Sequence, residues 1–339
     1  MKKVNIATLS FGHFHAYSYT RAVKELPRAN LVAVADDDPG RAKDAGQRYN
    51  VDHYLDYHDA LRRDDVDAVI VTSENAKHAK MAVDAAEAGK HILCEKPMAT
   101  TLADADNMMR AADKAGRTFQ MCFVMRYHAA SKLIKDVIDK GQIGKIVAIT
   151  GTNHLKWLEA IQTGFFARPE LSGGGSVIDH TVHLADMMRW YTKSEARKVY
   201  TTIGKNLHTE IPVEDNALTM VDFRSGAVGT IDGSWSRSAP WYMWGDMTLE
   251  IIGTKGLLLL DAFRQVVYVT QADPPNNRLE WNYWGCDADK EMVQSFVDCV
   301  LEDRKPIASA FDGRQGTEIT SACYESAKRG KPIKLPLSG

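Results

Sequence analysis

The segment Cys94-Glu95-Lys96-Pro97 places a lysine directly after an apolar stretch. Residues 67–94 read as a buried strand, an alanine-rich helix and a second strand, which is the pattern of parallel strands joined by a crossover helix. Ligands of open parallel sheets bind beyond the carboxyl ends of the strands. Because a residue before proline favours an extended backbone, no helix is expected to absorb Lys96. We therefore expect Lys96 at a ligand site, although an isolated lysine of this kind would be an ordinary surface residue.

A second group of reactive side chains follows the glycine triplet at 173–175. We expect a helix there that carries Asp179 and His183 on one face, because their spacing is four residues. A carboxylate beside an imidazole orients the ring and raises its basicity, which suits proton transfer. The alternatives are an ordinary helix-surface pair and a metal site with ligands drawn from Asp179, His180, His183 and His154. No compact motif such as His-Glu-x-x-His supports a metal, and we predict none.

The first strand-to-helix turn resembles a dinucleotide-binding turn that lacks two of its three glycines. Compared with G-x-G-x-x-G, Ser10 and His15 replace the first and third glycines, and Gly12 keeps the second, where the backbone must approach a pyrophosphate. The amides that open the following helix would face the phosphates. The residues assigned to this turn are Ser10, Phe11, Gly12, His13 and Phe14. Taken alone, the turn also fits an ordinary connection.

An acid follows the second expected strand, at Asp36, which is where an acid binds the ribose hydroxyls of NAD. The run Asp36-Asp37-Asp38 would repel the 2′-phosphate of NADP, so NAD is favoured. Arg41 is close enough to keep NADP possible. In the alternative interpretation, the aspartates cap a helix that begins near Pro39.

The elements that must position these groups fall into two parts. Residues 1–124 alternate strand and helix patterns, which predicts a doubly wound parallel sheet of the Rossmann type. Residues 125–339 contain a helix at 129–140, a series of strands and two closing helices, at 290–301 and 314–329. The strands are expected at 145–154, 198–204, 217–223, 227–234, 247–253, 256–261 and 266–269, with a hairpin turn at 224–226.

We therefore predict an α/β protein, with a Rossmann domain at 1–124 and an α+β substrate-binding and oligomerisation domain at 125–339. The second domain is expected to be built on a large, mostly antiparallel or mixed open sheet, and the last helix could pack back on the first domain. A wide sheet with one uncovered face needs a partner, so a homodimer or homotetramer is expected.

The composition excludes several classes of protein. The 339 residues contain 42 Lys+Arg and 44 Asp+Glu, for a net charge of -2, so we expect neither nucleic acid nor membrane as a partner. The amino-terminal apolar run is too short for a signal peptide. Five cysteines without a Cys-x-x-Cys pair fit reduced thiols in the cytoplasm.

Several motifs in order resemble those of the Gfo/Idh/MocA family, the glucose-fructose oxidoreductase and inositol dehydrogenase group, over nearly the whole chain. They are Glu95-Lys96-Pro97 with its lead-in, the glycine triplet followed by Asp179 and His183, Ser73-Glu74-Asn75-x-x-His78, and the closing segments near 309–316 and 324–332. Glu74 stands where the family has proline. The resemblance implies an NAD(P)-dependent oxidoreductase that transfers hydride between the nicotinamide and a secondary alcohol of a sugar, cyclitol or related polyol.

The resemblance also implies roles for single residues. Lys96 would contact the nicotinamide ribose and the substrate, with Asp179 and His183 on the substrate side. We choose His183 as the base and Asp179 as the group that orients it, because the hydroxyl proton must leave as the hydride does. Further cofactor contacts are expected from Ser73, Glu74, Asn75, His78 and Glu95. Further substrate contacts are expected from Arg126, Tyr127, His154, Trp157 and His180.

Two other functions stay open. One is an enzyme that keeps NAD bound and uses transient oxidation for epimerisation, elimination or glycoside cleavage. The other is a non-catalytic sensor or regulator that binds NAD(P), because a fold alone does not establish an activity.

Overall fold

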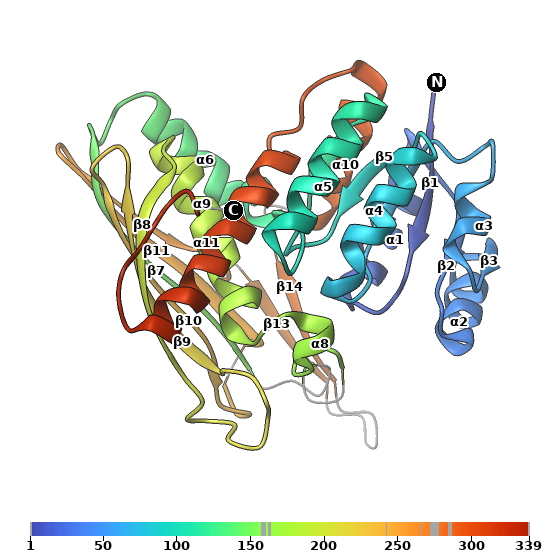
Figure 1. Ribbon diagram of the computed structural model, residues 1–339. Helices are drawn as coiled ribbons and strands as arrows, with labels where there is room; N and C mark the ends of the chain where they lie inside the picture. The colour runs from blue at the N-terminus through green and yellow to red at the C-terminus, as the bar shows by residue number, and fades with distance from the viewer. Residues whose placement is uncertain are drawn as a thin grey trace.

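Six parallel strands form the sheet of the first domain, in the order β3-β2-β1-β4-β5-β6 (Figure 1). The structure, a computed structural model, describes residues 2–156, 161, 164–241, 243–264, 266–271, 278–283 and 287–337. In sheet order, the strands are β3 (Asp52–Tyr54), β2 (Ala29–Ala35), β1 (Val4–Leu9), β4 (Ala68–Val71), β5 (His91–Cys94) and β6 (Phe119–Met121). All four residues of β4 are buried, as expected for a parallel strand covered on both faces. The predicted doubly wound sheet is confirmed.

Helices connect these strands. They are α1 (His15–Glu25), α2 (Pro39–Tyr49), α3 (Tyr57–Leu61), η1 (Asn75–Lys77), α4 (His78–Glu87), α5 (Leu102–Ala115) and η2 (Val124–Tyr127). Of these, α2, α3 and α5 begin at a residue whose side chain caps the helix. The side chain of Asp38 accepts the amide of Arg41 and Pro39 takes the first helical position, so Asp38 does cap α2. Thr101 caps α5, which ends at Gly116 in the left-handed conformation.

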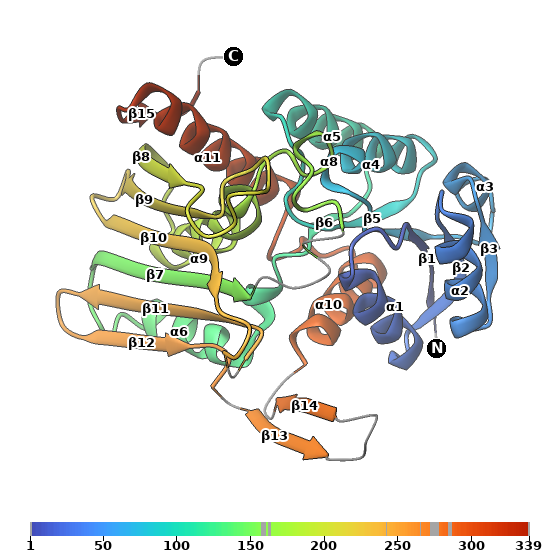
Figure 2. The ribbon, with the colours of Figure 1, turned by 90° about the horizontal axis from the view of Figure 1, so that it is seen from below.

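Seven strands form a mixed sheet in the second domain, in which β7 and β10 are parallel and the other neighbours antiparallel. In sheet order, they are β12 (Leu257–Asp261), β11 (Gly245–Gly253), β7 (Ile146–Lys156), β10 (Val228–Arg237), β9 (Asn216–Phe223), β8 (Ala196–Gly204) and β15 (Ile333–Lys334). Figure 2 shows these strands side by side. A separate hairpin consists of β13 (Val266–Gln271) and β14 (Arg278–Tyr283).

The helices of the second part lie between its sheet and the first domain (Figure 1). They are α6 (Ala129–Asp139), α8 (Pro169–Ser172), η3 (Val177–Thr181), α9 (Val182–Thr192), α10 (Ala288–Glu302) and α11 (Ala310–Arg329). The helix α10 packs on α1 and adds Met292 and Phe296 to the core of the first domain, although the helix expected to return there is the last one. The last helix, α11, contacts both α5 and β8. Because α10 and α11 both contact the first domain, the boundary near residue 124 stays a prediction.

Candidate active site

A cavity of about 780 Å³ lies between the two domains, at the carboxyl end of β5. Side chains of both domains line it, and Lys96, Asp179, His180 and His183 are among them. The structure thus brings together residues that are more than 80 positions apart in the sequence, as expected for a site at the strand ends. Other residues on the wall are His13, Phe14, His15, Met125, His128, Asn153, Leu155, Phe166, Trp244, Phe263 and Asp289.

Lys96 and Asp179 form an ion pair across the domain boundary. The Nζ atom of Lys96 lies 2.7 Å from Oδ1 of Asp179 and 3.3 Å from its carbonyl oxygen. The indole N–H of Trp235 donates to the other carboxylate oxygen at 3.3 Å. Burial alone would raise the pKa of Asp179, but the charge of Lys96, the nearby His180 and the hydrogen bond from Lys96 outweigh it and hold the pKa well below its usual range. Asp179 is therefore an anion at neutral pH.

The expected pairing of Asp179 with His183 is not formed. Residues 177–181 are π-helical, so the α-helical spacing of four does not apply, and the carboxylate of Asp179 faces Lys96 and Trp235. Nδ1 of His183 is buried, and the described residues offer it no hydrogen bond. Burial, followed by the charge of Lys96, lowers the pKa of His183 well below its usual value. His183 is therefore a neutral imidazole on the cavity wall.

His180 has a defined tautomer. Asn153 donates its side-chain N–H to the carbonyl of Asp246, so its side-chain oxygen faces Nδ1 of His180 at 2.9 Å, and that nitrogen must carry the proton. Nε2 then presents a lone pair 3.3 Å from Asp179. Burial lowers the pKa of His180 to about 4, so the ring is neutral.

The turn after β1 is built around Asp36. Oδ2 of Asp36 accepts the amide of Phe11 at 2.5 Å and the hydroxyl of Ser10 at 3.2 Å, and Oδ1 accepts the amide of Asp38. Arg41 Nε donates to both oxygens, at 3.0 and 3.1 Å. Ser10 has a φ of 73°, a conformation that glycine adopts readily at this first position of the turn. At this one position, Ser10 therefore takes the left-handed backbone conformation that the first glycine would take.

Gly12 and the loop after β4 complete this region. A Cβ on Gly12 would come within 3.2 Å of the carboxyl carbon of Glu74, so the turn has no room for a larger residue there. The carboxylate of Glu74 pairs with Lys77 at 3.1 Å, and Lys77 also pairs with Asp37 at 2.7 Å. Gly12 and Asp36 follow β1 and β2, at the positions predicted for the pyrophosphate turn and the ribose acid of an NAD site. The Asp36 side chain is fully buried and accepts hydrogen bonds from protein groups, so its contact with a ribose stays a prediction.

Other residues that were expected to contact the cofactor form hydrogen bonds that connect the loops around the cavity. The two ring nitrogens of His78 contact the carbonyl oxygens of Pro97 and Ser73, at 2.8 and 3.0 Å, which ties the loop after β4 to the loop after β5. Asn75 donates to the carbonyl of Ser172 in the second domain. The carboxylate of Glu95 accepts the amide of Lys96 and lies 3.3 Å from Nδ1 of His15.

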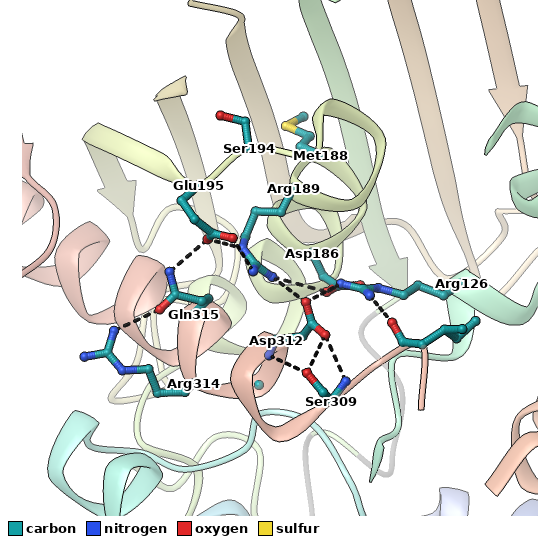
Figure 3. A network of polar contacts seen from close by, with 12 residues as sticks. Arg126, Asp186, Met188, Arg189, Ser194, Glu195, Ser309, Asp312, Arg314 and Gln315 are labelled. Atoms are coloured by element: carbon teal, nitrogen blue, oxygen red, sulfur yellow. Dashed lines mark hydrogen bonds and ion pairs between the residues drawn. The ribbon is translucent and has the colours of Figure 1, made fainter. Parts of the chain in front are cut away.

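Three residues that were expected to contact the substrate, Arg126, Tyr127 and His154, do not line the cavity. Arg126 is buried and is not among the residues that line the cavity. It donates to Asp186 and Asp312 (Figure 3) and to the carbonyl of Ile307. Tyr127 is 1% exposed and belongs to the core of the first domain. The expectation for both was wrong, since their neighbours Val124, Met125 and His128 form the wall instead.

His154 is on the opposite face of its strand. Side chains alternate along β7, so Asn153 and Leu155 face the cavity whereas His154 lies with Asp232, Asp246 and Arg237 on the outer face. The expectation for His154 was therefore wrong. Trp157 lies outside the described residues. Trp235 and Asn153 were not identified from the sequence. Side chains alternate along a strand, so a Leu155 that faces the cavity would have indicated that Asn153 faces it too.

His13, His15 and Glu95 offer ligand atoms within 4.8 Å of one another. Their hydrogen bonds account for this spacing, because Glu95 pairs with His15 and the backbone amide of His15 donates to Nδ1 of His13. We assign no metal to this group.

Comparison with known proteins gives consistent results. The family model described as the oxidoreductase family with an NAD-binding Rossmann fold (GFO_IDH_MocA) matches residues 4–123, and the GFO/IDH/MocA C-terminal domain matches residues 131–259. The chain is 28% identical to myo-inositol 2-dehydrogenase of Thermotoga maritima, over 92% of this chain and 93% of that protein. It is also 28% identical to scyllo-inositol 2-dehydrogenase (NAD(+)) of Bacillus subtilis, over 98% and 96%.

Solved structures share the fold. GenD2 from gentamicin A biosynthesis, in complex with NAD, has a TM-score of 0.89 at 23% identity, covering 99% of this chain and 97% of that one. Levoglucosan dehydrogenase with NADH and levoglucosan has a TM-score of 0.87 at 24% identity, covering 99% and 100%.

Proposed function

The chain belongs to the Gfo/Idh/MocA family of NAD-binding oxidoreductases, and from this premise we propose that it oxidises a secondary alcohol of a cyclitol, sugar or related polyol. The inositol dehydrogenases among its relatives support the substrate class. The observation that carries the proposal is the ion pair of Lys96 with Asp179 on the cavity wall, because it holds an ammonium group of the first domain against the substrate domain.

The cofactor is held by residues of the first domain. Ser10, Phe11 and Gly12 form the turn for the pyrophosphate, and Asp36 receives the adenosine ribose, which favours NAD over NADP. When bound, NAD would supply the acceptor for the hydride that leaves the substrate carbon. Arg41 forms ion pairs with Asp36 and Asp37. Its positive charge is therefore largely neutralised and less able to bind the 2′-phosphate of NADP.

The proton of the substrate hydroxyl passes to residues of this chain. Lys96 donates a hydrogen bond to the reacting oxygen and polarises it, while Asp179 keeps the ammonium group in place. His183 is neutral and lines the cavity, so it is able to accept the proton. The roles of these three residues follow from the family resemblance and from this arrangement.

Aromatic side chains supply a surface for a ring-shaped substrate. Trp244 lies on the wall, with its ring centroid 4.8 Å from that of Phe263. Aromatic faces suit the apolar C–H faces of sugars and cyclitols. We assign Trp244 to this role, in place of the several tryptophans that the sequence offers.

We also propose a homodimer, or a larger homo-oligomer, through the second sheet. Its outer face is uncovered within the described chain and bears exposed apolar side chains, which are Tyr200, Leu218, Met220, Val228, Ile252, Leu257 and Leu259. No helix among the described residues is long and apolar enough to cross a membrane. The cytoplasmic location stays a prediction, with four described cysteines present as buried thiols.

The test is NADH production across inositols, aldoses and glycosides, first with NAD and then with NADP. Production with one compound identifies the substrate class, and Lys96→Met is expected to lower kcat by about 100-fold or more while the Kd for NAD changes little. Lys90→Met is the matched control, because Lys90 is a buried lysine at the other end of β5 that donates only to backbone carbonyls.

Other outcomes distinguish the alternatives. No production, together with NAD released on denaturing the purified protein, would favour transient oxidation by a retained cofactor. Binding of NAD without turnover of any compound, in a protein free of retained cofactor, would favour a sensor. Unchanged kcat in Lys96→Met would refute the assigned role of Lys96.

A further inference from the structure

His13 is held in one tautomer by the backbone of its own turn. The backbone N–H of His15 donates to Nδ1 of His13 at 3.1 Å, so Nδ1 must present a lone pair. In the neutral ring the proton therefore lies on Nε2. The two nitrogens are on opposite sides of the imidazole, so Nε2 is directed away from this backbone contact.

The surroundings of His13 keep the ring neutral. His13 is 1% exposed and lies two residues before α1, whose amino-terminal end disfavours a positive charge. Burial is the main reason that the pKa of His13 lies well below its usual value. His15 and Lys96 lower this pKa further, while Glu95 and Asp179 oppose them.

The ring is also fixed in position. Phe14 and Phe166 pack on it, with centroids 4.7 and 5.2 Å away, and Phe166 belongs to the second domain. His13 lines the cavity that Lys96, Asp179 and His183 share. The described residues provide no hydrogen-bond partner for Nε2, so a donor on the wall is left for a bound molecule.

We propose that His13 donates a hydrogen bond from Nε2 to an oxygen atom of the molecule bound in this cavity. The proposal rests on the function proposed above, and the oxygen belongs either to the substrate or to the carboxamide of the nicotinamide. His13 is thus a neutral donor, and it differs from His180, whose tautomer leaves Nε2 as an acceptor.

Kinetics of two variants test this role. His13→Phe keeps the ring packing and removes the donor, and we expect kcat/KM to fall about tenfold to a hundredfold. His13→Gln restores an N–H near the position of Nε2 and should recover most of the loss. The pH profile of each variant should keep the shape of the wild-type profile, because the wild-type ring does not titrate near neutral pH.

The effects of His13→Phe on cofactor binding and on substrate kinetics distinguish the two possible acceptor oxygens. A weaker Kd for NADH in His13→Phe, with the Kd for ADP-ribose and the substrate KM unchanged, assigns the oxygen to the nicotinamide carboxamide. A raised KM or lowered kcat for the substrate, with NADH binding unchanged, assigns it to the substrate. Equal activity of His13→Phe and wild type, no recovery in His13→Gln, or loss of one limb of the pH profile would overturn the proposal.

A measurement without turnover keeps the inference independent of the proposed function. Side-chain ¹⁵N NMR of the histidine-labelled protein should show a neutral ring protonated at Nε2 from about pH 6 to 8, assigned by its absence in His13→Gln. Addition of NADH or of a candidate polyol should shift this signal if either molecule accepts the bond. A ring protonated at Nδ1, or one that titrates near neutral pH, would contradict the proposal even if the dehydrogenase assay succeeds.

Discussion

At the scale of single residues, Lys96 and Asp179 show how two opposite charges can both be accommodated where the side chains are nearly buried. Each charge compensates the desolvation of the other, and Trp235 satisfies the second carboxylate oxygen. Such a pair adds little net stability compared with apolar side chains of similar volume, so its presence is better explained by the proposed reaction. The consequences can be tested by removing one charge or both.

Asp179→Asn is expected to lower kcat/KM by about 100-fold or more, and to lower the free energy of unfolding by about 3 kcal/mol, because Lys96 would remain buried without a counter-charge. Lys96→Met combined with Asp179→Leu should regain most of the stability but none of the activity. Urea unfolding and steady-state kinetics of the three proteins provide the check. A double variant less stable than Asp179→Asn would contradict this account of the pair.

Asp36 is expected to select the cofactor. Asp36→Ser removes the ribose acid and releases Arg41, so NAD should bind about tenfold more weakly and NADP more tightly. Asp44→Ser is the control, because Asp44 is an exposed aspartate on α2 to which no role in cofactor binding is assigned. Fluorescence titration with NADH and NADPH measures both constants, and an unchanged ratio in Asp36→Ser would refute the assignment.

At the scale of elements, the sequence predicted those parts whose patterns are strong. The helix α6, the strand β9 and the turn at 224–226 have strong period or turn signals, and the structure places them within a residue of the expected bounds. β3 and β15 have three and two residues, too few for any periodicity to identify. Their strand form depends on tertiary pairing, of β3 with β2 and of β15 with β8, which is distant from β15 in the sequence.

The errors at the site have a similar origin. The sequence shows that Asp179 and His183 are close but does not reveal the π-helical turn that aims the carboxylate at Lys96. Arg126 follows the first domain as a substrate loop would, yet its partners Asp186 and Asp312 come from α9 and α11. Local pattern identifies which residues are reactive, whereas tertiary contacts determine which of them face the cavity.

The network around Arg126 joins η2, α9 and α11 (Figure 3). Asp312 accepts from both Arg126 and Arg189, two buried guanidinium groups, so Asp312→Asn should lower the free energy of unfolding by about 2–4 kcal/mol. Asp106→Asn removes a more exposed partner, that of Arg314, and should cost less than about 1 kcal/mol. Urea unfolding decides, and equal effects of the two substitutions would refute a structural role for the network.

At the scale of the whole molecule, buried histidines make the fold sensitive to acid. Burial lowers the pKa of His13, His78, His180 and His183 below the usual value. A group whose folded pKa is depressed is protonated more readily in the unfolded chain, so stability is lost as the pH falls below the unfolded value. For His180 the loss develops between about pH 6.5 and the folded pKa of about 4.

His180→Asn should reduce this acid sensitivity. Asparagine keeps a donor for Asn153 but does not titrate, so the loss of unfolding free energy between pH 7.5 and 5 should be smaller by about 2 kcal/mol than in the wild type. Urea unfolding of both proteins at pH 7.5 and at pH 5 measures this difference in unfolding free energy. An identical loss in both proteins would show that His180 does not contribute to the pH dependence.

The outer face of the second sheet sets the expected assembly. Leu218 and Leu259 are 63% and 71% exposed there, and a second copy of the same face would cover them and the other apolar side chains by a two-fold contact. Lysine at both positions would place charges in that contact, so Leu218→Lys with Leu259→Lys should yield a monomer where the wild type is a dimer or larger. Leu133→Lys is the matched control, because Leu133 is 64% exposed but lies on α6, away from this face. Sedimentation velocity distinguishes the three proteins, and a monomeric wild type, or a double variant that still associates, would exclude this face as the interface.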